Sequence, residues 1–108
     1  MKHLYDSGDY HWCLFMLHLV IEKLLKAYYV KYVGRNFPRI HDLLRLSELC
    51  GLSPDENQKT VLDRFTNFNI AARYPDFKDE LYRLATKEFT SEQISAATEL
   101  KKWLLNRL

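Results

Sequence analysis

Apolar residues recur every three or four positions between Tyr10 and Val33, which is the period of an α-helix. A first apolar series covers one side of this expected helix: Leu14, Leu17, Ile21, Leu24 or Leu25, Tyr28 and Tyr32. A second series covers the adjoining side: Trp12, Phe15 or Met16, Leu19 and Val20. Because each apolar side needs a partner that excludes water, the pattern predicts one long helix packed on two partners.

Helix-starting and helix-ending residues divide the rest of the chain into shorter segments. The first eight residues could form a single helical turn, after which Asp9 caps the long helix and Gly34 ends it. His41 and Asp42 then open a short helix, for which Gly51 is a natural end. These signals predict an irregular linker between the long helix and the short one.

Two capping patterns predict where the later helices start. Ser53-Pro54-Asp55-Glu56 offers a serine cap, a proline at the first helical position and a glutamate three residues after the cap. Tyr74-Pro75-Asp76 breaks that helix, a short helix follows over about 77–86, and Thr90-Ser91-Glu92-Gln93 starts the last one. The expected core positions are Leu43, Leu46, Val61, Phe65, Phe68, Ala72, Leu81, Leu84, Ile94, Ala97, Leu100, Leu104 and Leu108.

No segment alternates between apolar and polar residues as a strand does. The sequence therefore predicts an all-α fold, an up-and-down bundle of about four to five main helices in a single domain that covers residues 1–108. Hydrophobic residues make up 47% of the chain and Gly and Pro number only three each, which excludes disordered and collagen-like classes. With two cysteines and no signal-peptide pattern, we expect a soluble, cytoplasmic protein with free thiols.

The net charge of +2 is small, but positive charge is concentrated in one region. Between Lys23 and Arg45 there are six Lys and Arg residues and a single acidic one, Asp42. Such a basic segment is compatible with an anionic partner such as a nucleotide or RNA. It is also what the solvated end of a helix looks like, and this simpler interpretation is favoured by the charge pattern alone.

The polar residues of the long helix lie within about 80° of one another on a helical wheel: His11, His18, Glu22 and Lys26. Glu22 and Lys26 are four residues apart and can form an ion pair that holds the lysine in place. His11, His18 and Glu22 could also ligate a metal, but a solvent-facing seam explains the same residues. We therefore expect neither a metal nor a cofactor.

Two further groups of residues have both a structural and a functional interpretation. His41 could transfer a proton or contact a phosphate bound by Arg35 and Arg39, or else His41 and Asp42 merely stabilise the start of a helix. Arg73 and Tyr74, held beside the Pro75 turn, could contact a ligand or simply pack the helix junction.

Several of these segments together resemble the HEPN family. They are Gly8-Asp9-Tyr10, Glu22-Lys23 with Lys26-Ala27, Pro38-x-x-His41-Asp42-Leu43 and Ala72-Arg73-Tyr74-Pro75-Asp76. The resemblance implies a helical bundle that commonly forms homodimers and is often encoded beside a small nucleotidyltransferase in toxin–antitoxin or defence modules. It also implies a first helix that is shortened here, because family members often carry a fuller one.

Some HEPN proteins bind nucleotides, and others are metal-independent ribonucleases with an Arg-x(4–6)-His motif. Arg35 and His41 match that spacing, although in ribonuclease members the motif lies late in the domain. The histidine of such a motif would transfer protons around a ribose 2′-hydroxyl, and the arginine would stabilise charge on the phosphorus.

Three functional hypotheses follow. The leading one is a nucleotide- or RNA-binding homodimer. Within this hypothesis, the chain could be the toxin-side partner of a nucleotidyltransferase. Its expected site residues are Lys26, Arg35, Arg39, His41 and Arg73 for phosphate, with Glu22, Asp42 and Tyr74 orienting them. The second is a metal-independent ribonuclease with His41 and Arg35 as catalytic residues, and the third is a protein interaction module without a ligand.

Overall fold

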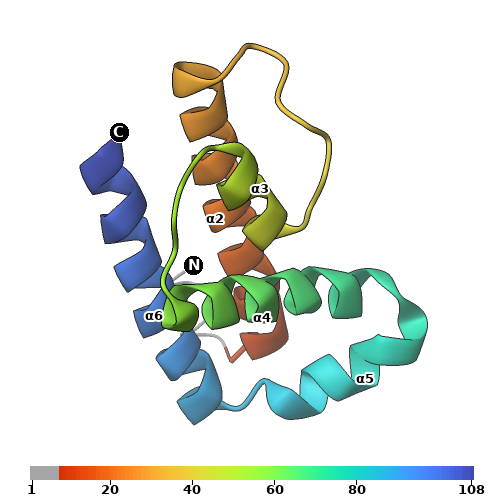
Figure 1. The fold of residues 1–108 in the computed structure, drawn as a ribbon. Coiled ribbons are helices and arrows are strands. Elements are labelled where there is room, and N and C mark those ends of the chain that lie inside the picture. The colour runs from red at the N-terminus through yellow and green to blue at the C-terminus, as the bar shows by residue number, and fades with distance from the viewer. Residues whose placement is uncertain (1–7) are drawn as a thin grey trace.

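The computed structural model describes residues 8–108, which form five helices (Figure 1). They are α2 (Tyr10–Tyr32), α3 (Leu43–Leu49), α4 (Glu56–Arg73), α5 (Pro75–Leu84) and α6 (Lys87–Arg107). No strand occurs in this described part of the chain, and the predicted all-α bundle is confirmed. The expected first turn and shortened first helix precede Gly8 and lie outside the described residues.

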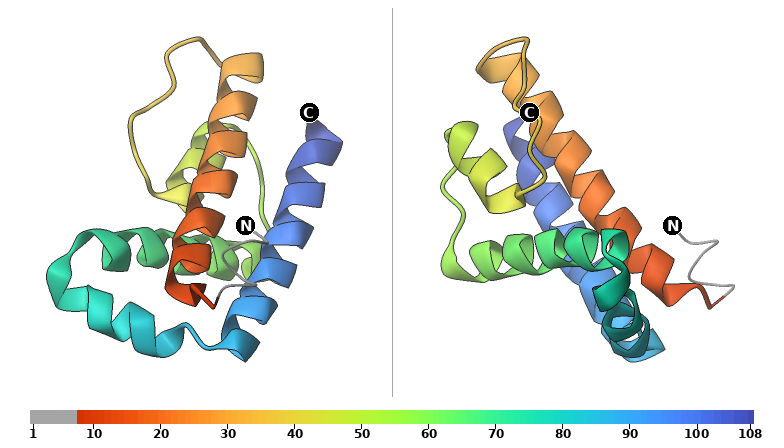
Figure 2. Two further views of the ribbon diagram at one scale, coloured as in Figure 1. Left: turned by 180° about the vertical axis from the view of Figure 1, so that it is seen from behind. Right: turned by 90° about the vertical axis from the view of Figure 1, so that its right-hand side faces the viewer.

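The two longest helices, α2 and α6, lie side by side and run in the same direction, while α4 crosses them and α5 returns along α4 (Figure 2). Hydrogen bonds join the ends of the long helices. The Tyr32 hydroxyl donates to the carbonyl oxygens of Arg107 at 3.0 Å and Leu108 at 2.9 Å, and the Lys31 ammonium also donates to Leu108. The short helix α3 packs against both α2 and α4.

The core lies where these helices meet. Its fully buried large side chains include Leu14, Ile21, Leu25, Leu43, Leu46, Leu62, Phe65 and Leu104. Burying an aliphatic or aromatic side chain of this size contributes about 1.5–3 kcal/mol each. Most predicted core positions are confirmed, but Leu84 is wrong, because it is 47% exposed on the outer side of α5.

The second apolar side of α2 is only partly covered within one chain. Trp12 is 50% exposed, and Phe15, Met16, Leu19 and Val20 are half-buried. The first side is covered by the core, except that Tyr32, which we expected there, is half exposed and bonds the end of α6 through its hydroxyl. The prediction that α2 needs two partners therefore stays open on this side.

Two predicted helix starts are wrong, that of α4 by two residues and that of α6 by four. Helix α4 is capped by Asp55, whose carboxylate accepts from the Gln58 N–H at 2.7 Å while the Gln58 side chain accepts from the Asp55 N–H at 2.9 Å. Helix α6 starts at Lys87 under a Thr86 cap, and Thr90 lies buried inside the helix. Each region holds several residues that can cap a helix, so tertiary packing selects the one that is used.

The two short helices follow the pattern more closely. Helix α5 starts at Pro75, at the break expected there, although it spans 75–84 where the sequence predicts 77–86. Helix α3 is capped by Asp42, whose carboxylate accepts from the Arg45 N–H at 3.2 Å. Of the two expected capping residues, Asp42 therefore makes this contact and His41 is left for another one.

Candidate functional site

The linker after α2 turns back and brings His41 against the middle of that helix. The His41 carbonyl accepts a hydrogen bond from the buried His18 side chain at 3.0 Å. The Leu43 N–H donates to the Thr66 hydroxyl at 3.0 Å, which ties the start of α3 to α4. At the other end of α3, the Cys50 thiol donates to the Leu25 carbonyl at 3.3 Å. These contacts fix His41 where α2, α3 and α4 meet.

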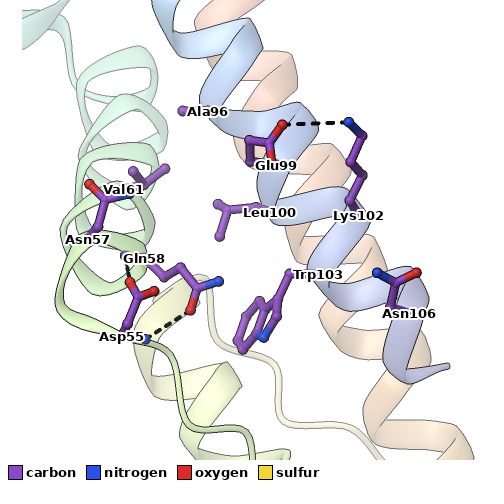
Figure 3. A pocket seen from close by; sticks show the side chains of 10 residues that line it. All are labelled: Asp55, Asn57, Gln58, Val61, Ala96, Glu99, Leu100, Lys102, Trp103 and Asn106. Carbon is purple, nitrogen blue, oxygen red and sulfur yellow. Dashed lines mark hydrogen bonds and ion pairs between the residues drawn. The ribbon is translucent and has the colours of Figure 1, made fainter.

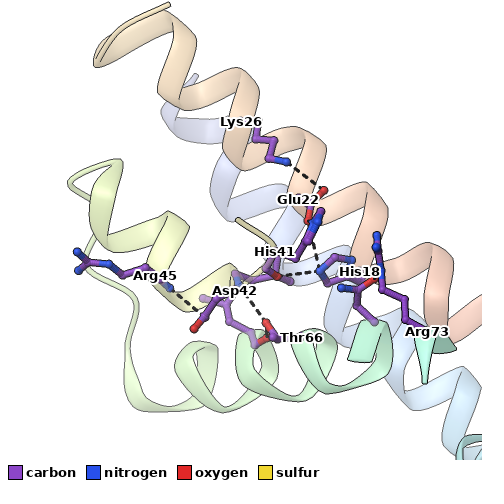
Figure 4. Close-up of polar contacts among 11 residues, drawn as sticks. His18, Glu22, Lys26, His41, Asp42, Arg45, Thr66 and Arg73 are labelled. Atoms are coloured by element: carbon purple, nitrogen blue, oxygen red, sulfur yellow. Dashed lines mark hydrogen bonds and ion pairs between the residues drawn. The ribbon is translucent and has the colours of Figure 1, made fainter. Parts of the chain in front are cut away.

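Glu22 lies at the centre of this junction (Figure 4). Its Oε1 lies 2.7 Å from Nδ1 of His41 and 3.5 Å from Nε2 of His18, and its Oε2 accepts from the Lys26 ammonium at 3.3 Å. Glu22 is only 7% exposed, and the Lys26 ammonium also lies 5.2 Å from the centre of the Phe37 ring. The carboxylate thus has hydrogen-bond donors on both oxygens.

The Glu22 carboxyl is ionised despite its burial. Burial alone raises the pKa of Glu22, but the hydrogen bond from His41, the nearby His18 and the Lys26 ion pair together outweigh it and lower that pKa below the ordinary value. The site therefore contains a buried negative charge that orients its neighbours.

His18 is fully buried, and its surroundings determine its tautomer. Its Nε2 faces two acceptors, the His41 carbonyl and the Glu22 carboxylate, so this nitrogen carries the proton. Its Nδ1 is buried with no hydrogen-bond partner among the described residues, so a proton there would be unpaired. Burial accordingly lowers the pKa of His18, with smaller contributions from the His41 ring and from Arg73, although the His41 carbonyl and Glu22 oppose the shift. His18 is held neutral.

His41 differs from His18 in its second ring nitrogen. One nitrogen of His41 is in a hydrogen bond and the other is accessible. Its Nδ1 donates to the Glu22 carboxylate, which leaves Nε2 as the lone-pair nitrogen of the neutral ring. The side chain is 46% exposed, and no group in the described part of the chain bonds Nε2. A carboxylate that fixes the tautomer of an exposed imidazole is an arrangement suited to proton transfer or to hydrogen bonding a ligand.

A groove of about 320 Å³ opens beside His41, between the start of α3 and the end of α4. It is lined by His41, Asp42, Thr66, Asn69, Ile70, Arg73 and Tyr74. The Arg73 Nε donates at 2.8 Å to the side-chain oxygen of Asn69, which is itself 3% exposed. Among the described residues no carboxylate lies within ion-pair distance of Arg73, so the groove holds an oriented and uncompensated cation.

The start of α3 itself offers little to an anion. The Leu43 N–H donates to the Thr66 hydroxyl, and the Arg45 N–H donates to the Asp42 carboxylate. Two of the backbone N–H groups at this helix start, which could otherwise bind an anion, are therefore already used. Any anion in this groove would depend mainly on the side chains of His41 and Arg73.

The structure gathers most of the expected site residues and separates two of them. His41, Asp42, Arg73 and Tyr74 line one groove, and Glu22 and Lys26 connect to it through His41. Arg35 and Arg39 are exposed on the α2–α3 linker and do not line the groove. The arginine brought to His41 is therefore Arg73, which lies on a different helix.

The solvent-facing alternative for the polar stripe of α2 is wrong at His18 and Glu22. His18 and Glu22 are buried because the linker folds back over them and supplies His41 as their partner. No group of three or more His, Cys, Asp or Glu side chains in residues 8–108 is arranged to hold a metal ion.

Sequence reasoning did not assign two residues that shape the site. His18 appeared only as a possible metal ligand, whereas it anchors the His41 backbone. Asn69 orients Arg73 from one helical turn away, and a polar residue on the core side of α4 was the available signal.

A larger cavity of about 510 Å³ lies between the start of α4 and the second half of α6 (Figure 3). Four of its polar side chains already partner one another, because Asp55 and Gln58 form the α4 capping box and Lys102 pairs with Glu99 at 3.6 Å. We therefore place the candidate site at the smaller groove, where an imidazole nitrogen and a guanidinium remain available.

The HEPN domain family model matches residues 1–108, the whole chain. The chain belongs to the HEPN domain family. HEPN domains are associated with nucleotide- and RNA-related functions, and they commonly dimerise. No curated protein and no solved structure matched this HEPN chain.

None of the helices described in this HEPN chain combines the length and the apolar character that crossing a membrane requires.

Proposed function

We propose that this HEPN chain binds nucleotides or RNA as a homodimer, with phosphate held in the groove between His41 and Arg73. The observation that carries the proposal is the Arg73 guanidinium, which a buried Asn69 orients and no carboxylate neutralises. A guanidinium offers a planar set of donors that matches phosphate oxygens, and such charge-assisted hydrogen bonds are strong. The accessible His41 nitrogen lines the same groove and adds a second contact.

Other residues support phosphate binding around this groove. Lys26 is held beside the site by Glu22, while Arg35 and Arg39 on the exposed linker add positive charge at longer range. Asp42 and Tyr74 line the groove, and we expect them to orient the side chains that contact phosphate. A nucleic acid strand that contacts several of these cations would bind with strong salt dependence.

A binding experiment tests the proposal. Labelled ATP and a labelled RNA oligonucleotide should bind at low salt, and Arg73→Ala should weaken binding by about 10- to 100-fold, as for the loss of a charged hydrogen bond. The matched control is Arg83→Ala, which removes an exposed arginine from α5, outside the groove. Absent binding at low salt, or equal binding by the two variants, would contradict the proposal.

A second candidate, metal-independent RNA cleavage, is favoured by the 2.7 Å contact between Glu22 and His41. In this reaction the His41 Nε2 takes the proton of a ribose 2′-hydroxyl, whose oxygen attacks the adjacent phosphorus. The bond to the 5′-oxygen breaks, and that oxygen leaves with a proton from water. Arg73 would stabilise the phosphorane charge in the groove, with Arg35 on the linker as the alternative cation.

Cleavage is tested in the presence of EDTA. The activity should disappear in His41→Ala, and comparing Arg73→Ala with Arg35→Ala should identify the arginine that stabilises the charge. Cleavage that survives His41→Ala would assign the activity to another site or to a contaminant.

We also propose that the chain acts as the toxin-side component of a module with a nucleotidyltransferase. Family membership supports this role. Co-expression with the product of a neighbouring nucleotidyltransferase gene should yield a stoichiometric complex and relieve any growth inhibition, and the absence of both effects would contradict this role.

A further inference from the structure

A third pocket, of about 220 Å³, lies between the first turns of α2 and the middle of α5. Three aromatic rings line it, those of His11, Trp12 and Tyr82, and Lys78 and Asp79 supply its charged groups. The nucleotide site described above uses none of these residues. The pocket is therefore a distinct feature of the molecule.

The rings are arranged around His11. The His11 ring centre lies 5.3 Å from that of Trp12 and 5.4 Å from that of Tyr82, with tilted planes in both pairs. Trp12 is 50% exposed and Tyr82 is 69% exposed. Large aromatic side chains are usually covered, so two exposed rings beside a hollow offer flat surfaces to a planar ligand.

This pocket neighbours the phosphate groove. Ala72 lines the pocket, and the next residue, Arg73, lines the groove. On α2, His11 of the pocket lies two turns before His18, the residue that binds the His41 backbone, which is a rise of about 10 Å. Stacked nucleotides advance about 3.4 Å each along a strand, so this separation spans about three of them.

We propose that the aromatic pocket binds a nucleobase with an exocyclic amino group, within a single-stranded RNA whose phosphates occupy the His41–Arg73 groove; the inference rests on the proposed function. Proteins bind unpaired bases by stacking them on aromatic rings and by hydrogen bonding their edges. Trp12 and Tyr82 supply the rings, and Lys78 contacts a flanking phosphate.

Asp79 determines which bases fit the pocket. A carboxylate only accepts hydrogen bonds, so it favours a base edge that carries an amino group and disfavours one that carries a carbonyl. Cytosine has an amino donor at the position where uracil has an oxygen acceptor, as in thymine. The pocket therefore prefers cytosine to uracil, although the two rings have nearly the same size.

A cationic ligand is the other chemistry that aromatic rings and a carboxylate can bind. Here Lys78 lines the same pocket as Asp79 and offsets its charge, so a second cation would meet repulsion. A base that is linked to phosphates gains from the same lysine. For this reason we favour the nucleobase.

Fluorescence of Trp12 reports on stacking directly. In Trp103→Phe, Trp12 is the single remaining tryptophan, and a cytidine hexanucleotide should quench it at low salt. When Tyr82→Ala is introduced into this Trp103→Phe variant, binding of the oligonucleotide should weaken by about 5- to 100-fold, as for the loss of one stacking contact. The matched control is Phe77→Ala, an exposed aromatic on the same helix that does not line the pocket.

The base preference gives an independent measurement. Cytidine hexanucleotide should bind more tightly than uridine hexanucleotide, and Asp79→Asn should reduce that difference because an amide can donate to the uracil oxygen. Equal binding of the two oligonucleotides by the unmodified chain would overturn the assignment of an amino-bearing base.

The outcomes separate this inference from the proposed function. RNA binding that depends on Arg73 but not on Tyr82 would refute the base pocket and leave the phosphate groove intact. If the unmodified chain binds no RNA at all, both the base pocket and the phosphate groove are refuted. Quenching of Trp12 by tetramethylammonium, with none by RNA, would overturn the inference in favour of a cation site.

Discussion

Glu22 connects more of the site than any other residue described. It is nearly excluded from solvent, yet it stays ionised because His41, His18 and Lys26 all surround it. The carboxylate matters because of its position between these three side chains. It fixes the His41 tautomer and confines Lys26 at the same time.

Glu22→Gln should therefore lower the free energy of unfolding by about 1–3 kcal/mol, the range for a hydrogen bond to a charged group. The value stays modest because His41 is nearly half exposed and water screens part of the lost interaction. Urea denaturation measures the change, and the nitrogen chemical shifts of the His41 ring should show its tautomer no longer fixed. Glu48→Gln, which removes an exposed ion pair with Arg45, is the control and should cost less than about 1 kcal/mol. A Glu22 effect no larger than the control would contradict this role.

The buried His18 predicts a pH dependence of stability. Its pKa is lowered in the native state, mainly by burial, so below the ordinary value of 6.5 the unfolded chain binds a proton that the native chain does not. The free energy of unfolding should therefore fall as the pH drops from 7 towards 5, by up to about 1.4 kcal/mol per pH unit. The lowered pKa of Glu22 adds a further loss below its ordinary value of 4.5, since the unfolded chain protonates there first.

Urea denaturation across this range checks the expectation. His18→Gln keeps an N–H donor for the His41 carbonyl but removes the titrating ring, so the share of the slope between pH 7 and pH 5 that His18 causes should vanish. An unchanged slope in His18→Gln would show that other groups cause the dependence.

At the scale of single helices, the starts of α4 and α6 show how closely competing caps can lie. Ser53 and Asp55 are two residues apart, and both have side chains that can accept from backbone N–H groups. Only Asp55 makes the reciprocal pair of hydrogen bonds with Gln58. The difference between the two caps is therefore a difference in tertiary position, since their local propensities are similar.

Asp55→Ala should destabilise the protein by about 1 kcal/mol, the usual cost of losing an N-cap. Ser53→Ala, at the cap that the sequence favours, should change the free energy of unfolding by less than about 0.5 kcal/mol because Ser53 is exposed and lies outside the helix. Thermal or urea denaturation of the two variants decides between the caps. A larger loss in Ser53→Ala would place the start of α4 earlier than the structure does.

At the scale of the whole molecule, α2 packs one apolar side into the core and leaves the other partly open. A twofold dimer needs a self-complementary patch, and we expect the half-buried face around Met16, Leu19 and Val20 to supply it. This face is on the same helix as the stripe that holds Glu22. The candidate site and the proposed dimer interface therefore share one rigid element.

Leu19→Glu should convert a dimer to a monomer by placing a charge in an apolar interface, as measured by sedimentation equilibrium at micromolar concentration. Leu84→Glu is the control, because Leu84 is exposed on α5, away from that face. A monomer in the unmodified chain would contradict the dimer, and dissociation by both variants would show that the effect is not specific to α2.

Much of the fold could be predicted because helices depend on local pattern. The long helix was predicted to end at Val33 and ends at Tyr32, and the break at Tyr74-Pro75 lies where the proline requires it. The exposure of Leu84 could not be predicted in this way. Apolar periodicity says which side of a helix is buried only when a partner of sufficient length covers that side.

The sequence by itself determined the helices and most of their core positions, and it named several residues that line the candidate site. Only the tertiary structure decided that His41 meets Glu22 and that Arg73, rather than Arg35, shares the groove with His41. The physical reason is separation along the chain. Glu22 and Lys26 meet because one helical turn brings them together, whereas His41 and Arg73 meet only because a ten-residue linker folds back and α4 crosses α2.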